Sequence, residues 1–192
     1  MTDFDTQLIY SWWWRPDAGW YQGVARRYGF EVANEINKEA LKFVAERIGR
    51  NIAKMRERPL KEMEFSEAVR AFGECCEAMW PEELLQYNST ITGPDSFEVN
   101  IVHNFAIDML RRAGTLDKYE CPCLPLREGW FKGLGLKPGE NRRVQCMLDG
   151  CDVCTLVASV PSFAEKEQGG TQASQAEVAV AQGAGESHEQ GT

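Results

Sequence analysis

The sequence lacks an excess of basic residues and any long apolar run. It holds 21 Lys and Arg against 29 Asp and Glu, which gives a net charge of -8. Nucleic-acid grooves and anionic membrane surfaces attract chains rich in Lys and Arg, so neither kind of partner is expected. No stretch approaches the roughly 18 apolar residues of a membrane span, and the N-terminus lacks the basic and apolar segments of a signal peptide. We therefore expect a cytoplasmic protein whose partner is a small molecule or another protein.

Histidine is also scarce, which limits the chemistry that the chain can perform. His103 is the only histidine before the C-terminal tail. The sequence has no HExxH motif, no Ser, His and Asp order, no GK[ST] phosphate loop and no basic recognition helix. A conventional hydrolase, an ATPase segment and a DNA-binding segment are therefore not expected. A free-standing domain of this kind is expected to act as an enzyme or to deliver a ligand or metal.

What is present is one body and one polar tail. The chain has 192 residues, 43% of them hydrophobic, which is enough for a single domain with a sizeable core. We assign residues 1–160 to this domain. From 161 to 192 the composition turns to Gly, Gln, Ser, Ala and Glu, which cannot bury enough apolar surface to become ordered. This segment is predicted to be a disordered acidic tail.

Hydrophobic periodicity predicts helices interrupted by two hairpins. One long apolar stripe recurs at every fourth position, at Val32, Ile36, Ala40, Val44, Ile48 and Ile52. Helices are expected over 17–29, 30–58, 66–80, 104–113 and 124–136, and hairpins over 87–101 and 142–160. This order predicts an α+β domain, in which N-terminal helices are followed by a small antiparallel sheet of two hairpins with intervening helices.

Cysteines cluster near the end of the predicted domain. In a reducing compartment, cysteines are more often core side chains, metal ligands or reactive thiols than disulfides. Those in the cluster are Cys121, Cys123, Cys146, Cys151 and Cys154. They stand at turns and prolines, so their thiolates could complete a tetrahedral zinc site, our first choice, or hold an iron-sulfur cluster. The alternative is that they are small core hydrophobes, as we expect for Cys75 and Cys76.

The length of the last loop decides whether two of these thiols share a face. Side chains alternate along a strand. If residues 149–151 form the loop, Cys146 pairs with Cys154 on one face of the hairpin. A two-residue turn at Asp149 and Gly150 would place the two thiols on opposite faces. Metal ligation therefore predicts the longer loop.

Other side chains are candidates for catalysis or ligand binding. His103 could be a general base or a ligand, because imidazole titrates near neutrality, and Glu128 could be an acid-base group. The alternatives are an ordinary hydrogen-bonded histidine and a solvated carboxylate. Aromatic walls with charges at the rim could hold a planar or carboxylated ligand. The residues proposed for this role are Trp13, Arg15, Asp17, Trp20 and Trp130. Core packing and an exposed partner-binding tryptophan are the alternatives here.

The run "CPCLPLREGWFKGLGLKPGENRRVQCMLDGCDVC" resembles the C-terminal half of 4-vinyl-reductase-type small-molecule-binding domains. Cys121 or Cys123, Gly129-Trp130, Cys146, Gly150 and Cys154 fill the places of that pattern. The related L-2-amino-thiazoline-4-carboxylate hydrolase-like proteins end in a similar hairpin. The resemblance implies zinc-binding thiolates beside a buried pocket for an aromatic or other apolar ligand. Members of that family can carry an acidic metal ligand just before the middle cysteine, where this chain has Arg143 and Val144. Cys151 is a further cysteine that the family pattern does not include.

Two functions are therefore carried forward. The first is a small cytoplasmic enzyme that acts on a small or aromatic or heterocyclic compound, with the metal polarising the substrate or only fastening the hairpin to the pocket wall. The alternative is a non-catalytic accessory protein that binds a ligand or metal and delivers it to a protein partner. A fully cysteine-filled site favours a structural metal, because catalytic zinc keeps one position open for water.

Overall fold

The structure is a computed structural model that describes residues 6–164. Its elements are, in order, α1 (Thr6–Tyr28), α2 (Phe30–Lys54), η1 (Leu60–Glu62), α3 (Phe65–Glu77), β1 (Leu85–Ile91), β2 (Ser96–Asn104), α4 (Phe105–Ala113), η2 (Leu116–Lys118), α5 (Cys123–Leu134), β3 (Glu140–Gln145), η3 (Met147–Asp149) and β4 (Cys154–Ser159). The predicted α+β class, with helices, a hairpin, further helices and a last hairpin, is confirmed. The predicted tail lies outside the described residues beyond 164.

The two hairpins join into one antiparallel sheet with the strand order β1-β2-β4-β3. The central pairing sets β2 against β4, with Val99 opposite Leu156. Alternate residues of these two strands are buried, and they point to the same face of the sheet. They are Phe97, Val99, Ile101, Cys154, Leu156 and Ala158. The sheet therefore has one core face, and the helices must cover it.

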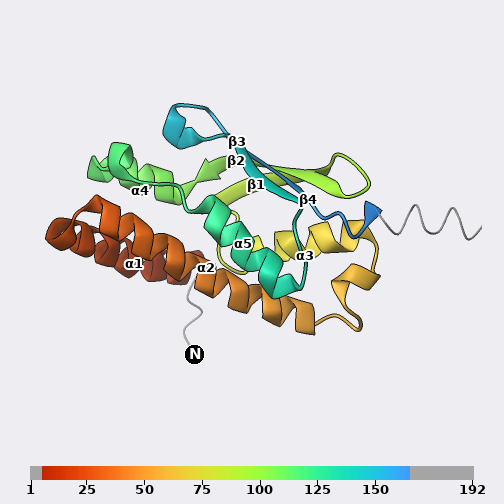
Figure 1. The fold of residues 1–192 in the computed structure, drawn as a ribbon. Coiled ribbons are helices and arrows are strands. Elements are labelled where there is room, and N and C mark those ends of the chain that lie inside the picture. The colour runs from red at the N-terminus through yellow and green to blue at the C-terminus, as the bar shows by residue number, and fades with distance from the viewer. Residues whose placement is uncertain (1–5, 165–192) are drawn as a thin grey trace, which may run out of the picture.

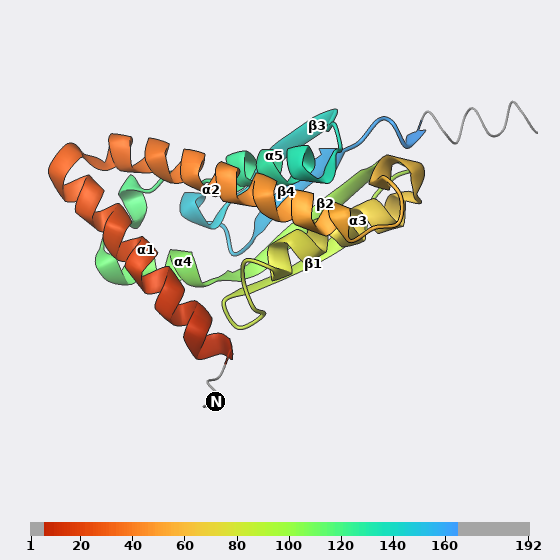
Figure 2. The ribbon, with the colours of Figure 1, turned by 90° about the horizontal axis from the view of Figure 1, so that it is seen from below.

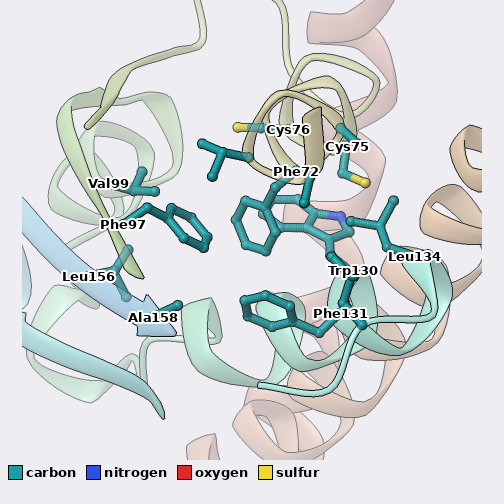
Figure 3. Packing of buried hydrophobic residues seen from close by; sticks show 14 of the residues in the cluster. Phe72, Cys75, Cys76, Phe97, Val99, Trp130, Phe131, Leu134, Leu156 and Ala158 are labelled. Atoms are coloured by element: carbon teal, nitrogen blue, oxygen red, sulfur yellow. The ribbon is translucent and has the colours of Figure 1, made fainter. Parts of the chain in front are cut away.

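Helices cover that core face in two layers. Figure 1 shows α3 and α5 next to the sheet, with α1 and α2 beyond them. Figure 2 shows α1 and α2 diverging from their junction near Gly29, so that α2 follows α3 and α5 while α1 passes near α4. Phe72 of α3, Phe97 of β2 and Phe131 of α5 pack against one another, with ring centroids 4.9 to 6.4 Å apart. Figure 3 shows these rings together with Trp130 and Leu156 in the core.

A close crossing of α2 and α5 holds the two helical layers together. A Cβ atom on Gly129 would lie 2.8 Å from Ala45 Cβ and would also strike the Lys42 carbonyl oxygen. A Cβ on Gly133 would lie 2.9 Å from Gly49 Cα. Glycines on facing sides of the two helices therefore let the backbones approach more closely than any side chain would allow.

The first helix is longer than the sequence predicted. We expected it to begin at Asp17, because Pro16 lacks a backbone N–H and disfavours a helix interior. The structure instead begins α1 at Thr6 and keeps Pro16 inside the helix. Tertiary packing offsets the local cost, because Trp14 stacks on Trp80 with ring centroids 5.4 Å apart.

The apolar stripe predicted for α2 is only partly buried. Ile52 is buried, but Val32 and Val44 are 38% and 43% exposed. Four residues advance a helix by about 400°, so an exact four-residue repeat drifts around the axis by about 40° at each step. The buried face instead follows Ala33, Ala45, Gly49 and Ile52. The helix also ends at Lys54, before the predicted limit at Arg58.

The core extends slightly beyond the predicted domain boundary at residue 160. Phe163 is 4% exposed, and its ring centroid lies 5.2 Å from that of Phe65. Val160 is also buried. The first residues assigned to the tail therefore belong to the packed body. None of the helices described between residues 6 and 164 is long and apolar enough to cross a membrane.

Candidate functional site

A cavity of about 490 Å³ lies between the helices and the core face of the sheet. Its buried lining is mostly apolar and comes from α3, β2, α5 and β4. Residues that supply this lining include Phe72, Cys76, Val99, Leu126, Trp130 and Leu156. The volume falls within the range of small-molecule sites, about 300 to 1,000 Å³. The cavity can therefore enclose a small organic molecule in apolar surroundings.

The exposed residues of α1 form an outer part of the cavity lining. Arg15 and Asp17 line it, as predicted for a charged rim. Trp14 also lines it, whereas Trp13 and Trp20 are 75% and 57% exposed and are not among its lining residues. A helix turns about 100° per residue, so neighbouring tryptophans cannot share one direction. Of the Trp12–Trp14 run, the structure thus places Trp14 at the cavity, and not Trp13, which the sequence analysis proposed.

Four of the five clustered cysteines line the cavity together: Cys121, Cys123, Cys146 and Cys154. The Cys154 thiol donates a hydrogen bond to Cys146 Sγ at 3.6 Å. The Cys121 and Cys154 thiols act as hydrogen-bond donors to Cys146 and lower the pKa of Cys146 far below its usual range. Cys121 also lowers the pKa of Cys123 in the same way. The four sulfurs thus form one interacting group in which Cys123 and Cys146 favour the thiolate form, while the donors Cys121 and Cys154 have pKa values raised well above the usual range and stay protonated.

Backbone amides add to this stabilisation of thiolates. The Met147 N–H donates to Cys154 Sγ at 3.2 Å. Hydrogen bonding from the Leu148 backbone contributes to the lowered pKa of Cys146. Both amides belong to η3, the short helical turn between β3 and β4. Amides that point toward sulfurs favour the charged form of a thiol, which is the form that binds metals.

The predicted approach of Cys146 to Cys154 is found, with their sulfurs 3.6 Å apart, but the loop is longer than expected and the two residues are not paired within the strands. The last pair between the two strands is Gln145 with Thr155, after a register irregularity between Arg143 and Gln145, and Cys146 follows the end of β3. We expected strands as far as Leu148 and from Asp152. The structure instead ends β3 at Gln145 and begins β4 at Cys154. The helical turn η3 and the left-handed Gly150, with φ of 85°, occupy the residues between them. Cys151 lies in this connection, half-buried, and is not among the cavity-lining residues.

The thiols of the cluster are not arranged as a ready metal site. Within residues 6–164, no group of three or more His, Cys, Asp or Glu side chains is already placed to hold a metal ion. The donor set nevertheless fits zinc chemically, because four soft thiol ligands from two turns can complete a tetrahedron.

Cys123 is the first residue of α5, where we had expected extended backbone, since Pro125 is accommodated in the first helical turn.

Two arginines lie near the thiols but differ in their surroundings. Arg143 is partly exposed and interacts with Cys146 and Asp149, and its guanidinium lies 3.6 Å from Asp149 Oδ2. Arg127 is 2% exposed and lines the cavity. Burial lowers the pKa of Arg127 to about 10, while the nearby Cys123 and Cys76 thiols act in the opposite direction. Arg127 therefore remains a buried cation at neutral pH.

A buried amide network positions the segment that leads to Cys121. Asn34 is 2% exposed on α2. Its side-chain oxygen accepts hydrogen bonds from Tyr21 Oη at 2.7 Å and from the Glu120 amide at 3.1 Å. Its nitrogen donates to the Lys118 carbonyl oxygen at 2.9 Å. This one side chain therefore fastens the segment before Cys121 to both long helices.

The two predicted acid-base residues are placed away from the cavity. His103 lies at the end of β2, partly exposed, with Nδ1 3.8 Å from Asp108 Oδ2. Glu128 is exposed on α5 and pairs with Lys42 at 2.6 Å. Neither is among the cavity-lining residues, whereas Trp130 is. Sequence reasoning missed Arg127, although its spacing of three from Trp130 places both on one side of α5.

No protein-family model matches the chain, and no curated protein matches it significantly. The resemblance to 4-vinyl-reductase-type domains therefore stays a prediction. Among solved structures, the phenol-responsive sensory domain of the transcription activator PoxR with phenol matches with a TM-score of 0.53. The match covers 83% of this chain and 76% of that chain at 13% sequence identity. At this identity, the two chains share a fold, and this chain is similar in architecture to a small-molecule-binding sensory domain.

Proposed function

We propose that this protein is a small-molecule-binding domain whose cavity is closed on one side by a four-cysteine zinc centre. The observation that carries the proposal is the apolar cavity of about 490 Å³, lined by buried core residues and by the four thiols. The similarity to a phenol-responsive sensory domain supports it. Binding is favoured over catalysis, because His103 and Glu128 do not line the cavity.

In this proposal Cys121, Cys123, Cys146 and Cys154 hold the zinc. Four thiolates leave no open position for water, so the metal supplies structure and fastens the β3–β4 connection to the start of α5. The amides of η3 that face the sulfurs support this role. All seven cysteines are free of disulfides in the structure, so the four thiols of the cluster are available as ligands.

Titration calorimetry with 2-naphthol, a planar phenol, tests the binding function. Two valines of β2 supply a matched pair, because Val99 lines the cavity and Val102 lies on the opposite face of the sheet, 48% exposed. Val99→Phe places a ring in the cavity and should abolish binding. Val102→Phe, with the same change in size, should bind as the unaltered protein does.

The comparison is valid if both variants retain zinc and the folded state. Metal analysis and circular dichroism measure these two properties. Equal binding by the two variants, or no binding by the unaltered protein, would contradict a function in this cavity. Iron with inorganic sulfide and a brown colour, in place of zinc, would replace the zinc centre by an iron-sulfur cluster.

A further inference from the structure

Arg127 is a buried cation for which the described part of the chain supplies no full set of partners. Its Nε donates to Asn141 Oδ1 at 2.8 Å. One of its terminal nitrogens, Nη2, is buried and has no hydrogen-bond partner among residues 6–164. The guanidinium carbon instead lies 4.9 Å from the ring centroid of Phe72 and 5.7 Å from that of Phe97. Aromatic faces attract the charge but leave its N–H groups unused.

A buried charged group with an unused N–H donor destabilises the folded state. A charge removed from water destabilises the fold unless a counter-charge and hydrogen bonds replace the lost hydration. Arg56, another arginine with a largely buried side chain, has such a counter-charge, since it pairs with the Glu74 carboxylate at 2.7 Å. Arg127 has an amide oxygen and aromatic faces in that place. A partner from outside the chain would complete its surroundings.

The thiols are the alternative counter-charge, because Cys123 and Cys76 lie near enough to favour the charged form of Arg127. A second arginine, Arg143, interacts directly with Cys146 and is exposed on β3. The Nη2 atom of Arg127 makes no hydrogen bond to any sulfur in the described part of the chain. Arg127 also lines the cavity, whereas Arg143 does not. Both arginines therefore lie near the thiols, but only Arg127 also faces the enclosed space, and its Nη2 is left without a hydrogen bond there.

A second buried donor near the cavity belongs to Trp130 and points away from the enclosed space. Trp130 Nε1 is buried without a partner. In Figure 3 the indole nitrogen lies toward Leu134, which does not line the cavity. The Trp130 ring thus serves as an apolar wall, together with Phe72 and Phe97. The buried part of the cavity combines flat aromatic walls with the one guanidinium of Arg127.

We infer that the cavity accepts a small aromatic molecule that carries a carboxylate, whose oxygens pair with the guanidinium of Arg127. The inference rests on the proposed binding function and specifies the class of ligand. A planar guanidinium matches a carboxylate in geometry and charge, and the pairing is strongest where water is excluded. The ring of the ligand would lie among the aromatic side chains of the inner wall.

Titration calorimetry on the full-length, zinc-loaded protein tests this with 2-naphthoate and 2-naphthamide. The two probes have nearly the same shape and differ in charge. The unaltered protein should bind 2-naphthoate at least about tenfold more tightly, as expected for a charge-assisted hydrogen bond in a buried site. Arg127→Met keeps an unbranched apolar stem and should remove that preference while leaving the binding of 2-naphthamide within about twofold. Arg127→Lys should retain part of the preference.

Arg112, exposed on α4 and outside the cavity lining, provides the control. Arg112→Met should keep the full preference for the acid. Loss of zinc from Arg127→Met would assign the arginine to the thiols and overturn the inference. Tight binding of 2-naphthamide without a preference for 2-naphthoate would overturn the inference but leave the binding function intact. Binding of neither probe would contradict both.

Discussion

At the scale of single residues, the cysteines of the cluster divide into two kinds. Cys146 and Cys154 are buried at 0% and 3% exposure, and their sulfurs touch. Cys151, only three residues before Cys154, is half-buried in the connection and lies outside the cavity lining. This difference gives a matched pair of substitutions within one loop.

We predict that Cys154→Ser loses zinc and that Cys151→Ser keeps it. A serine hydroxyl is a much poorer ligand for zinc than a thiolate, and loss of a structural metal removes folding energy. Metal analysis of protein purified without oxygen should give about one zinc per chain for the unaltered protein and for Cys151→Ser. Thermal unfolding of Cys154→Ser should occur at a lower temperature. The same zinc content in both variants would contradict the assignment of ligands.

At the scale of elements, the crossing of α2 and α5 controls how the cavity wall is built. The segment from Leu126 to Trp130 supplies three cavity-lining side chains, and its position depends on the close approach at Gly129. We predict that Gly129→Ala lowers the free energy of unfolding by about 2 to 3 kcal/mol, because the new methyl group overpacks the crossing.

Gly23→Ala is the control for this change. Gly23 lies inside α1, and a Cβ there would meet no atom within 4 Å. Alanine should stabilise that helix by about 0.5 to 1 kcal/mol, because it restricts the unfolded chain more than glycine does. Chemical denaturation of both variants measures the difference. Equal effects at the two sites would show that the α2–α5 backbones are not in close contact.

The elements that local sequence signals specify were predicted well. Asn104 caps α4 by accepting a hydrogen bond from the Ala106 amide at 3.0 Å, and Gly114 ends the helix with φ of 65°. These signals lie within one turn of the helix end, so they are readable without the fold. The N-terminal half of α1 was missed for the opposite reason. Its order depends on Trp80, which lies more than 60 positions away from Trp14.

At the scale of the whole molecule, the packed body ends after residue 160. Phe163 packs on Phe65 and Val160 is buried, so the last hairpin is continued by a segment that closes the core. We predict that a chain ending at Ala164 unfolds with nearly the free energy of the full-length protein. A chain ending at Val160 should lose about 3 kcal/mol, the cost of deleting a buried phenylalanine. Equal stability of the two truncated chains would show that the packed domain ends at residue 160, as the sequence analysis predicted.

The cavity was the least predictable feature, because it exists only when the whole molecule is assembled. Sequence reasoning expected an apolar pocket near the cysteines and named Arg15, Asp17 and Trp130, which do line it. It could not select Trp14 over Trp13 or find Arg127, because burial of a charged residue follows from tertiary packing and not from periodicity. The convergence of the thiols could be anticipated, since strand register and turn spacing are local properties.

The central claim is that a thiolate metal centre and a small-molecule cavity form one site. The visible absorption spectrum of the cobalt-substituted protein, recorded with and without 2-naphthol, tests it most directly, because tetrahedral cobalt bound by thiolates absorbs strongly and responds to changes beside the metal. We predict such bands and a change in them as the probe fills the cavity. Absence of these bands would contradict the metal centre, and bands that stay the same while the probe binds would contradict its place in the cavity wall.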